Sequence, residues 1–304
     1  MTINDRFNRV CSGHAQAYLK LTIMSLFLGG IFIAGRMMAD EIPPVLAALI
    51  RFLIASVCLL GLLYWQERRF PIPSKTECFG LICLGLTGIS GYNLLILQAL
   101  QTVEAGRSAV LVSCNPVLIT LLSCVFLGER LTCLKTTGIM ISVSGALLVA
   151  SKGDMAILLN FSSGDKAVLG AMLCWAVYSI IGKQLLKTMT PITAVTYASI
   201  AGTLILAPLA LYSCDLSLLT RLPCTIWLAL LYLAIPGTVV ALLFFYQGIE
   251  SIGVVKAGIF INLIPVSTLL LSIPLLGERF SSSTLIGTAM VILGVFTVNR
   301  ERTN

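Results

Sequence analysis

The side chains best suited to chemistry in this chain are polar and aromatic groups that interrupt long apolar stretches. A buried amide, hydroxyl or indole must find a hydrogen-bonding partner, because leaving it unpaired costs roughly a few kcal/mol. Such groups either bind the polar atoms of a small molecule or hydrogen-bond between neighbouring helices. The candidate binding residues are Asn93, Gln98, Ser113, Asn115, Trp175, Tyr178, Tyr246, Gln247 and Asn262.

Two prolines mark a second kind of candidate. Pro116 and Pro265 fall near the middle of apolar stretches, and Ser113 and Asn262 precede them by one helical turn. A proline inside a helix removes a backbone hydrogen bond, which a membrane tolerates only where neighbours or water satisfy the backbone. We predict that both prolines are gating kinks beside a substrate cavity. A static kink that only shapes packing is the alternative.

Aromatic and charged side chains add two further candidates. Trp175 and Tyr178 lie three residues apart, so they share a helix face and could stack on a planar substrate or pack against lipid and neighbouring helices. Arg51 lies inside an apolar stretch, where an ionisable residue suggests function. We expect it to extend toward the outer face and pair with Asp40 or Glu41. The alternative is that Arg51 attracts an anionic group on a substrate.

Several kinds of chemistry are excluded by what the chain lacks. The single histidine, His14, lies in the polar N-terminal segment, no Cys-x-x-Cys pair occurs, and no phosphate-binding Walker A sequence is present. We therefore predict no metal, no cofactor and no enzymatic activity. The Asp and Glu residues lie in loops, tails or end turns, which disfavours a buried carboxylate proton relay and favours uniport or exchange.

Composition shows which solvent surrounds these residues. The chain has 304 residues, of which 58% are hydrophobic and 11% charged, and its mean hydropathy is +0.99. A soluble domain carries about 25% charged residues, so lipid must surround most of this chain. The formal charge of +7 comes from basic residues scattered singly or in pairs between apolar stretches, unlike the basic patch of a nucleic-acid-binding protein. We predict lipid and a small molecule as partners, and no nucleic acid.

The apolar stretches predict an all-α polytopic membrane protein with ten transmembrane helices. A bilayer core of about 30 Å requires roughly 20 apolar residues in a helix, and prolines and glycines separate such stretches here. The predicted spans are 18–38, 43–65, 78–100, 104–127, 132–151, 166–186, 191–213, 223–247, 254–276 and 282–299.

Basic residues predict the orientation of these spans. Lys and Arg concentrate in cytoplasmic loops, and placing the N-terminus inside gives that face thirteen basic residues against seven on or near the other. We therefore predict that both termini are cytoplasmic and that the membrane is the bacterial inner membrane.

The chain contains an internal repeat. Residues 97–149 align with 246–298 without a gap, and thirteen of these 53 positions are identical. Earlier in each half, an offset of 147 residues places Gly35-Arg36 on Gly182-Lys183. Each half holds five spans, and because five is odd, the second half enters the membrane from the opposite face. The matching special residues are Gln98/Gln247, Pro116/Pro265, Gly128-Glu129-Arg130/Gly277-Glu278-Arg279, Gly138/Gly287 and Gly145/Gly294.

Glycines of this repeat also predict close helix packing. Gly138 and Gly145 in the first half, and Gly287 and Gly294 in the second, place small residues along one stripe of each fifth span. The stripes can pack within one chain or between two protomers, so the sequence allows a monomer or a homodimer. The two Gly-Glu-Arg turns are expected to be structural, ending one helix and starting the next.

The repeated pattern Pro-x11-Gly-Glu-Arg, followed by spaced glycines, resembles the EamA family of the drug/metabolite transporter superfamily. Pro44-x6-Arg51-Phe52 resembles that family's pattern as well. The family often has Trp-Gly in the first span, whereas this chain has Leu28-Gly29 there and Trp175-Ala176 in the second half. The resemblance covers 18–151 and 165–300 as two five-helix repeats.

The resemblance implies a secondary transporter that exports or exchanges small metabolites such as amino acids or drugs by alternating access. A membrane channel is one alternative, although rings of charge and repeated filter loops are missing. A non-transporting structural or regulatory membrane subunit is the other alternative.

Overall fold

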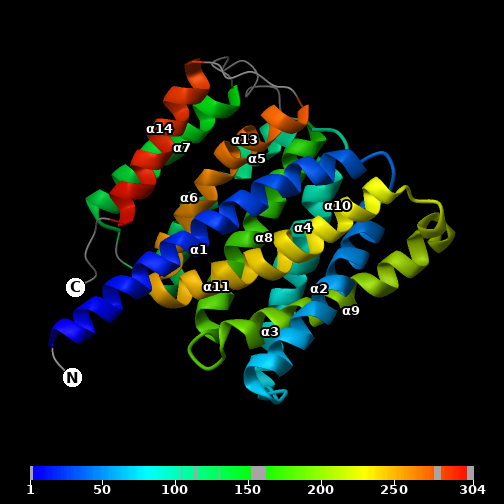
Figure 1. The fold of residues 1–304 in the computed structure, drawn as a ribbon, viewed down its shortest axis with the longest axis horizontal. Coiled ribbons are helices and arrows are strands. Elements are labelled where there is room, and N and C mark those ends of the chain that lie inside the picture. The colour runs from blue at the N-terminus through cyan, green and yellow to red at the C-terminus, as the bar shows by residue number, and fades with distance from the viewer. Residues whose placement is uncertain are drawn as a thin grey trace.

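Helices form the whole of the chain's regular structure where it is described (Figure 1). The computed structural model describes residues 3–103, 105–112, 115–129, 131–151, 162–276 and 282–299. The elements of the first part are α1 (Ile3–Met38), α2 (Pro44–Glu67), α3 (Lys75–Leu84), η1 (Gly85–Gly91), α4 (Tyr92–Ala99), α5 (Ala105–Val112), α6 (Asn115–Leu127) and α7 (Cys133–Ser151). Those of the second part are α8 (Ser163–Leu185), α9 (Pro191–Ser213), η3 (Leu216–Thr220), α10 (Cys224–Ala234), η4 (Ile235–Val240), α11 (Ala241–Ile252), α12 (Val254–Gly258), η5 (Ile259–Leu263), α13 (Ile264–Leu276) and α14 (Ser282–Asn299).

The predicted spans coincide with single helices or with runs of short helices. Six helices in the described chain are long and apolar enough to cross a membrane: Ala15–Met38, Pro44–Glu67, Lys75–Ala99, Ser163–Leu185, Pro191–Ser213 and Cys224–Ile252. Three shorter apolar helices accompany them at Asn115–Leu127, Val254–Thr268 and Ala289–Val298. The protein is therefore all-helical in its described part and has the character of a polytopic membrane protein.

Two features of the helices were not part of the sequence-based expectation. Helix α1 extends back to Ile3, while its apolar part, Ala15–Met38, contains the predicted span 18–38. The helix continues into the polar N-terminal segment, which contains no proline to end it. The runs α3–η1–α4 and α10–η4–α11 each contain a π-helical turn. Apolar patterning does not distinguish such a turn from ordinary α-helix, so the sequence did not predict it.

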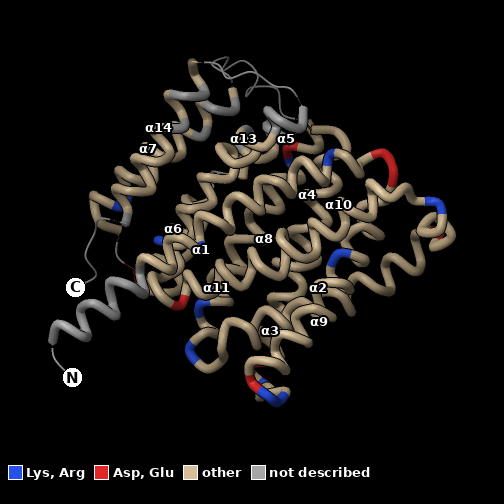
Figure 2. The backbone as a smooth tube through the Cα atoms, in the orientation of Figure 1, with Lys and Arg blue, Asp and Glu red and all other residues tan. Residues whose placement is uncertain are grey.

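The outer surface of the bundle is apolar, as lipid requires. Val57, Val125 and Phe126 are 66%, 74% and 65% exposed, although each lies within a helix. Most charged residues lie instead at helix ends and in connecting loops (Figure 2). A surface of this kind is stable when hydrocarbon covers its middle and water its ends.

Contacts between connections show which helix ends lie together. The hydroxyl of Thr190, before α9, donates to the Glu67 carboxylate at the end of α2 (2.6 Å). Tyr197 donates to the carbonyl oxygen of Pro71 (2.7 Å) in the loop that precedes α3. Both hydrogen bonds lie at helix ends that the charge distribution assigns to the same face of the membrane.

Two cations hold helix C-termini at positions that the repeat makes equivalent. Arg36 Nη1 donates to the carbonyl oxygen of Leu100 (2.8 Å), just beyond α4. Lys183 Nζ donates to the carbonyl oxygen of Ile249 (3.2 Å), near the end of α11. A basic side chain is favourable there because the last carbonyls of a helix carry partial negative charge.

The glycine stripes bring α7 and α14 into close contact within the chain (Figure 1). A Cβ added at Gly138 would lie 3.0 Å from the Gly294 carbonyl oxygen, and one at Gly145 would lie 2.6 Å from that of Gly287. Because the later residue of one helix meets the earlier residue of the other, the two helices run antiparallel. The stripes are therefore used between helices of one chain.

Candidate functional site

A cluster of aromatic rings joins three helices inside the bundle. Trp175 of α8 lies 4.8 Å from Tyr92 of α4, 5.3 Å from Phe245 of α11 and 5.5 Å from Tyr178, measured between ring centroids. Tyr246 lies 5.3 Å from Tyr178 in the same way. Tyr178 and Tyr246 are fully buried, and Trp175 is 5% exposed. The structure thus brings together three of the residues predicted from the sequence.

The polar atoms of this cluster have unused hydrogen-bonding capacity. Trp175 Nε1 and the hydroxyls of Tyr178 and Tyr246 are buried without a partner at hydrogen-bond geometry in the described structure. The two hydroxyls are nevertheless close enough to interact with each other. Buried polar groups in proteins nearly always have hydrogen-bond partners. The indole N–H therefore requires a partner that the described structure does not supply.

Glycines allow the aromatic rings to lie directly on helix backbones. A Cβ built at Gly88 would lie 2.1 Å from Tyr178 Cδ2, and one at Gly182 would lie 2.4 Å from the Tyr246 hydroxyl oxygen. At the position equivalent to Gly88, Gly237 lies against the aliphatic side chain of Ile31. The two halves therefore make an equivalent contact on a glycine, with Tyr178 in one case and Ile31 in the other.

Arg51 is buried beside this cluster, so the expectation that it extends toward the outer face was wrong. It is 4% exposed, and its guanidinium donates to Asn93 Oδ1 (2.7 Å), Thr238 Oγ1 (2.7 Å) and the Gly237 carbonyl oxygen (3.1 Å). Asp40 and Glu41 are exposed and do not pair with it. Hydrogen-bond acceptors inside the bundle hold Arg51, and the carboxylates of Asp40 and Glu41 do not.

Gly237 and Thr238 belong to the π-helical turn η4, and Asn93, at the start of α4, bonds to the π-helical turn η1. Asn93 Nδ2 donates to the carbonyl oxygens of Gly88 (3.0 Å) and Ile89 (2.9 Å) in η1. Thr238 in η4 donates to the Leu233 carbonyl oxygen (2.7 Å). A π-helical turn disturbs the regular backbone bonding, and such turns frequently lie at functional sites. These side chains satisfy the backbone where the helices are irregular.

The predicted prolines lie near the starts of two helices. Pro265 is the second residue of α13, directly after the 3₁₀ turn η5, and Pro116 is the second residue of α6. Proline is well tolerated in the first turn of a helix, where its missing N–H has no partner to lose. In the ninth predicted span, α12 and α13 therefore meet at η5, just before Pro265.

Two predicted asparagines are buried near these prolines. Asn262 Nδ2 donates to Ser142 Oγ (2.6 Å), whereas Asn262 Oδ1 has no partner in the described structure. Asn115, at the start of α6, has no partner for either side-chain atom. Helix α6 packs against α8, which carries Trp175. Ser113 lies outside the described residues.

The two repeat-related glutamines have different surroundings. Gln247 is partly buried and accepts a hydrogen bond from Lys20 Nζ (2.8 Å). Gln98 is exposed on α4, and its side chain makes no hydrogen bond in the described structure. The glutamines therefore match in sequence while their contacts differ.

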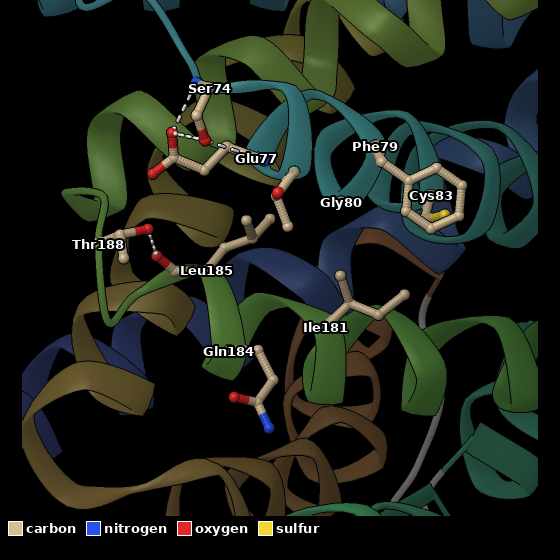
Figure 3. A pocket seen from close by; sticks show the side chains of 10 residues that line it. Ser74, Glu77, Phe79, Gly80, Cys83, Ile181, Gln184, Leu185 and Thr188 are labelled. Atoms are coloured by element: carbon tan, nitrogen blue, oxygen red, sulfur yellow. Dashed lines mark hydrogen bonds between the residues drawn. The ribbon is translucent and has the colours of Figure 1, made fainter.

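A cavity of about 410 Å³ lies elsewhere, at the ends of α3 and α8. Figure 3 shows Phe79 and Cys83 of α3 facing Ile181 and Leu185 of α8, with Glu77 and Thr188 at its rim. None of the predicted binding residues lines this cavity. It is distinct from the aromatic cluster.

Sequence reasoning missed Tyr92, Phe245 and Thr238. Tyr92 is adjacent to the predicted Asn93 in sequence, and Phe245 is adjacent to Tyr246. For Thr238 the available signal was Gly237, which the repeat offset of 149 places on Gly88. Extending the repeat alignment toward the start of each third span would have found it.

Comparison with known proteins places this architecture in a family. The model of the EamA-like transporter family matches residues 16–151 and 162–300. The chain is 29% identical to the uncharacterized transporter YyaM of Bacillus subtilis (strain 168), covering 94% of each chain. It is 31% identical to the uncharacterized transporter YetK of the same organism, covering 92% of this chain and 86% of the relative.

A third relative has a more specific name, and a solved structure shares the fold. The chain is 28% identical to a probable terminal-alkyne amino-acid exporter of Streptantibioticus cattleyicolor, covering 84% of this chain and 83% of the relative. A crystal structure matches with a TM-score of 0.75 at 19% identity, covering 94% of this chain and 97% of that chain. With two family matches along its length and relatives named as transporters, this chain is an integral membrane protein that belongs to the EamA-like transporter family.

Proposed function

We propose that this protein is a secondary transporter that exports or exchanges small metabolites, such as amino acids or drugs, by alternating access. Its two halves, 18–151 and 165–300, are inverted five-helix repeats that hold the substrate between them near mid-membrane. It resides in the bacterial inner membrane with both termini in the cytoplasm, as a monomer or a homodimer.

Paired contacts support the inverted arrangement. Arg36 binds the carbonyl oxygen of Leu100, and Lys183 binds that of Ile249; both partners are related by the repeat. The antiparallel contact of α7 with α14 joins the fifth span of each half. Two copies of one bundle that cross the membrane in opposite directions account for both observations.

The single observation that carries the proposed site is the unsatisfied indole N–H of Trp175 within a buried aromatic cluster. Buried polar atoms without partners are rare and are explained by a ligand, water or ion that completes them. In this family of transporters, a substrate with polar groups and a flat apolar part would satisfy the indole and stack on the rings.

The second half supplies the aromatic part of this site. Trp175 and Tyr178 stand where the first half has Leu28 and Ile31. Substrate would therefore contact aromatic rings on one side and aliphatic side chains on the other. Packing that the fold requires would be similar in both halves. The difference between aromatic and aliphatic residues therefore supports a binding function.

An irregular turn beside Pro265 supplies a means of movement. Because the 3₁₀ turn η5 separates α12 from α13, the ninth predicted span can tilt there without breaking a continuous α-helix. Pro265 follows this turn, and Pro116, its repeat equivalent near the start of α6, is the second gating residue. Asn115 and Asn262 lie beside them and would contact the substrate with Ser113.

Flux measurements in proteoliposomes test the proposal. Purified protein should transport at least one radiolabelled amino acid or related metabolite from a screened panel, and the initial rate should saturate with concentration. Trp175→Leu, which introduces the residue of the first half, should lower this flux about tenfold or more, since removing an aromatic stacking contact and a hydrogen bond costs over 1 kcal/mol.

Trp65→Leu is the matched control, because Trp65 is 70% exposed near the end of α2 and should leave flux nearly unchanged. Equal loss of flux in both variants would remove the aromatic cluster as the site. A rate that rises linearly with concentration would indicate a channel. No flux for any compound of the panel would favour a non-transporting subunit.

A further inference from the structure

The charge of Arg51 has no negative partner in the described structure. Its three bonding partners, Asn93, Thr238 and Gly237, are neutral. A buried ion loses its hydration and is stable only with compensating charge or hydrogen bonds, so removing a cation from water without an anion is costly. The residue therefore needs a function that outweighs this cost.

The guanidinium also has donors to spare. Arginine carries five N–H groups, and three of them are used: the one on Nε, one on Nη1 and one on Nη2. The two remaining N–H groups belong to Nη1 and Nη2, the nitrogens that bind a carboxylate in bidentate pairs. Arg51 therefore keeps a binding capacity that the protein itself does not fill.

The repeat indicates that the fold does not require an arginine here. The equivalent position in the second half is Ala198, which is fully buried, and Leu242 stands where the first half has Asn93. The second half builds the same spans with apolar residues at both positions. Arg51 and Asn93 are therefore polar residues of the first half that have no polar counterparts in the second half.

The region around Arg51 contains aromatic rings and an indole N–H that has no partner in the described structure. Asn93 connects Arg51 to the Gly88 carbonyl oxygen, and Tyr178 packs directly on Gly88. Tyr92, next in sequence to Asn93, lies against Trp175. The unsatisfied indole N–H of Trp175 belongs to the same cluster, so this region favours a ligand with negatively charged oxygens and a planar apolar part.

We propose that Arg51 binds the carboxylate of the transported substrate, whose apolar part lies against the Trp175 and Tyr178 rings. This inference rests on the proposed function and specifies its substrate class as small organic carboxylates. The bonds from Arg51 to Thr238 and Gly237 join α2 of the first half to η4 of the second. A bound carboxylate therefore acts where the two halves are tied together.

The test compares carboxylates with their own carboxamides. Purified wild-type protein is titrated with amino acids and aryl carboxylates, each paired with its amide, and thermal stabilisation is measured. A ligand that binds only the folded protein raises the melting temperature. At least one acid should stabilise the protein, and its amide should bind about tenfold or more weakly, as expected for loss of a charge-assisted hydrogen bond.

Variants then locate the effect. Arg51→Gln should weaken binding of that acid about tenfold or more while leaving its amide unaffected, and Arg51→Lys should retain part of the difference. Arg36→Gln is the matched control, because Arg36 holds a helix end and should preserve the preference for the acid. The wild-type acid and amide pair remains informative even where Arg51→Gln fails to fold.

Four outcomes would overturn this inference. One is equal binding of acid and amide by wild-type protein, and another is that no carboxylate stabilises it. The third is stabilisation by sodium chloride alone that abolishes the preference for the acid, which would make inorganic chloride the ligand. Saturable flux of a neutral metabolite that Arg51→Gln leaves intact would refute the carboxylate role while leaving the transporter proposal standing.

Discussion

Asn93 illustrates how one side chain supports an irregular part of this protein. Its amide nitrogen satisfies two carbonyl oxygens of η1, and its amide oxygen accepts from Arg51. Asn93→Leu introduces the residue that the second half has at the equivalent position, but it removes one of the three acceptors of Arg51 and the amide that bonds the Gly88 and Ile89 carbonyl oxygens. We expect a loss of about 1–3 kcal/mol in the free energy of unfolding.

Thermal unfolding in detergent measures this loss as a lower melting temperature. Gln98→Leu is the control, because exposed Gln98 has no hydrogen bond to lose in the described structure and should change stability by about 0.5 kcal/mol or less. An equal melting temperature for Asn93→Leu and wild type would show that the Arg51 network contributes little to stability.

The candidate site could be predicted only in part at this scale. Trp175, Tyr178 and Tyr246 were recognisable because aromatic and polar groups stand out within apolar helices. The position of Arg51 was not, because its acceptors Gly237 and Thr238 lie far along the chain in the other half. No local pattern encodes a contact across that distance, so snorkelling to the nearest face was the simpler expectation.

At the scale of elements, the α7–α14 contact depends on glycine. A Cβ added at Gly294 would lie 2.5 Å from Ser142 Cβ and 2.6 Å from the Gly138 carbonyl oxygen, so the helices must move apart. We expect Gly294→Ala to lower the free energy of unfolding by about 1–3 kcal/mol, as overpacking does. The measurement is again the melting temperature.

Gly61→Ala provides the comparison, because nothing lies within 4 Å of a Cβ added at Gly61 in α2. Alanine favours helix over glycine by about 0.5–1 kcal/mol, so this variant should be neutral or stabilised. If Gly294→Ala is as stable as Gly61→Ala, the close packing of the two helices is not important for stability.

Elements were predictable where the sequence contains a physical signal. Prolines and apolar length located the helices, because both act locally. The π-helical turns η1 and η4 were not predictable, since π- and α-helix bury the same apolar side chains. The predicted span 18–38 lies within the apolar part of α1, and the extension of the helix to Ile3 was not predicted because polar residues can remain helical outside a membrane.

For the whole molecule, the repeat was the most informative feature of the sequence. The repeat aligns Arg36 with Lys183. The carbonyl oxygens that these side chains bind, those of Leu100 and Ile249, are at equivalent positions as well. Such symmetry is visible because special residues recur at a constant offset. Asymmetry between the halves, at Arg51 and in the aromatic cluster, required the structure.

Orientation in the membrane is testable with two native cysteines. Cys78 and Cys224 are both exposed thiols, and the charge distribution places Cys78 near the cytoplasmic face and Cys224 near the outer face. In intact cells a membrane-impermeant maleimide should label a single-cysteine variant that retains Cys224. The variant that retains Cys78 should be labelled only after permeabilisation, and the reverse pattern would invert the topology.

The most direct test of the central claim, alternating access between two inverted halves, is counterflow in proteoliposomes. Vesicles are preloaded with an unlabelled compound that the protein transports, and entry of the same labelled compound is followed. A carrier with one alternating site predicts transient accumulation of label above equilibrium, abolished by Trp175→Leu and retained by Trp65→Leu. Entry that only approaches equilibrium, at a rate independent of the preloaded compound, would contradict the account.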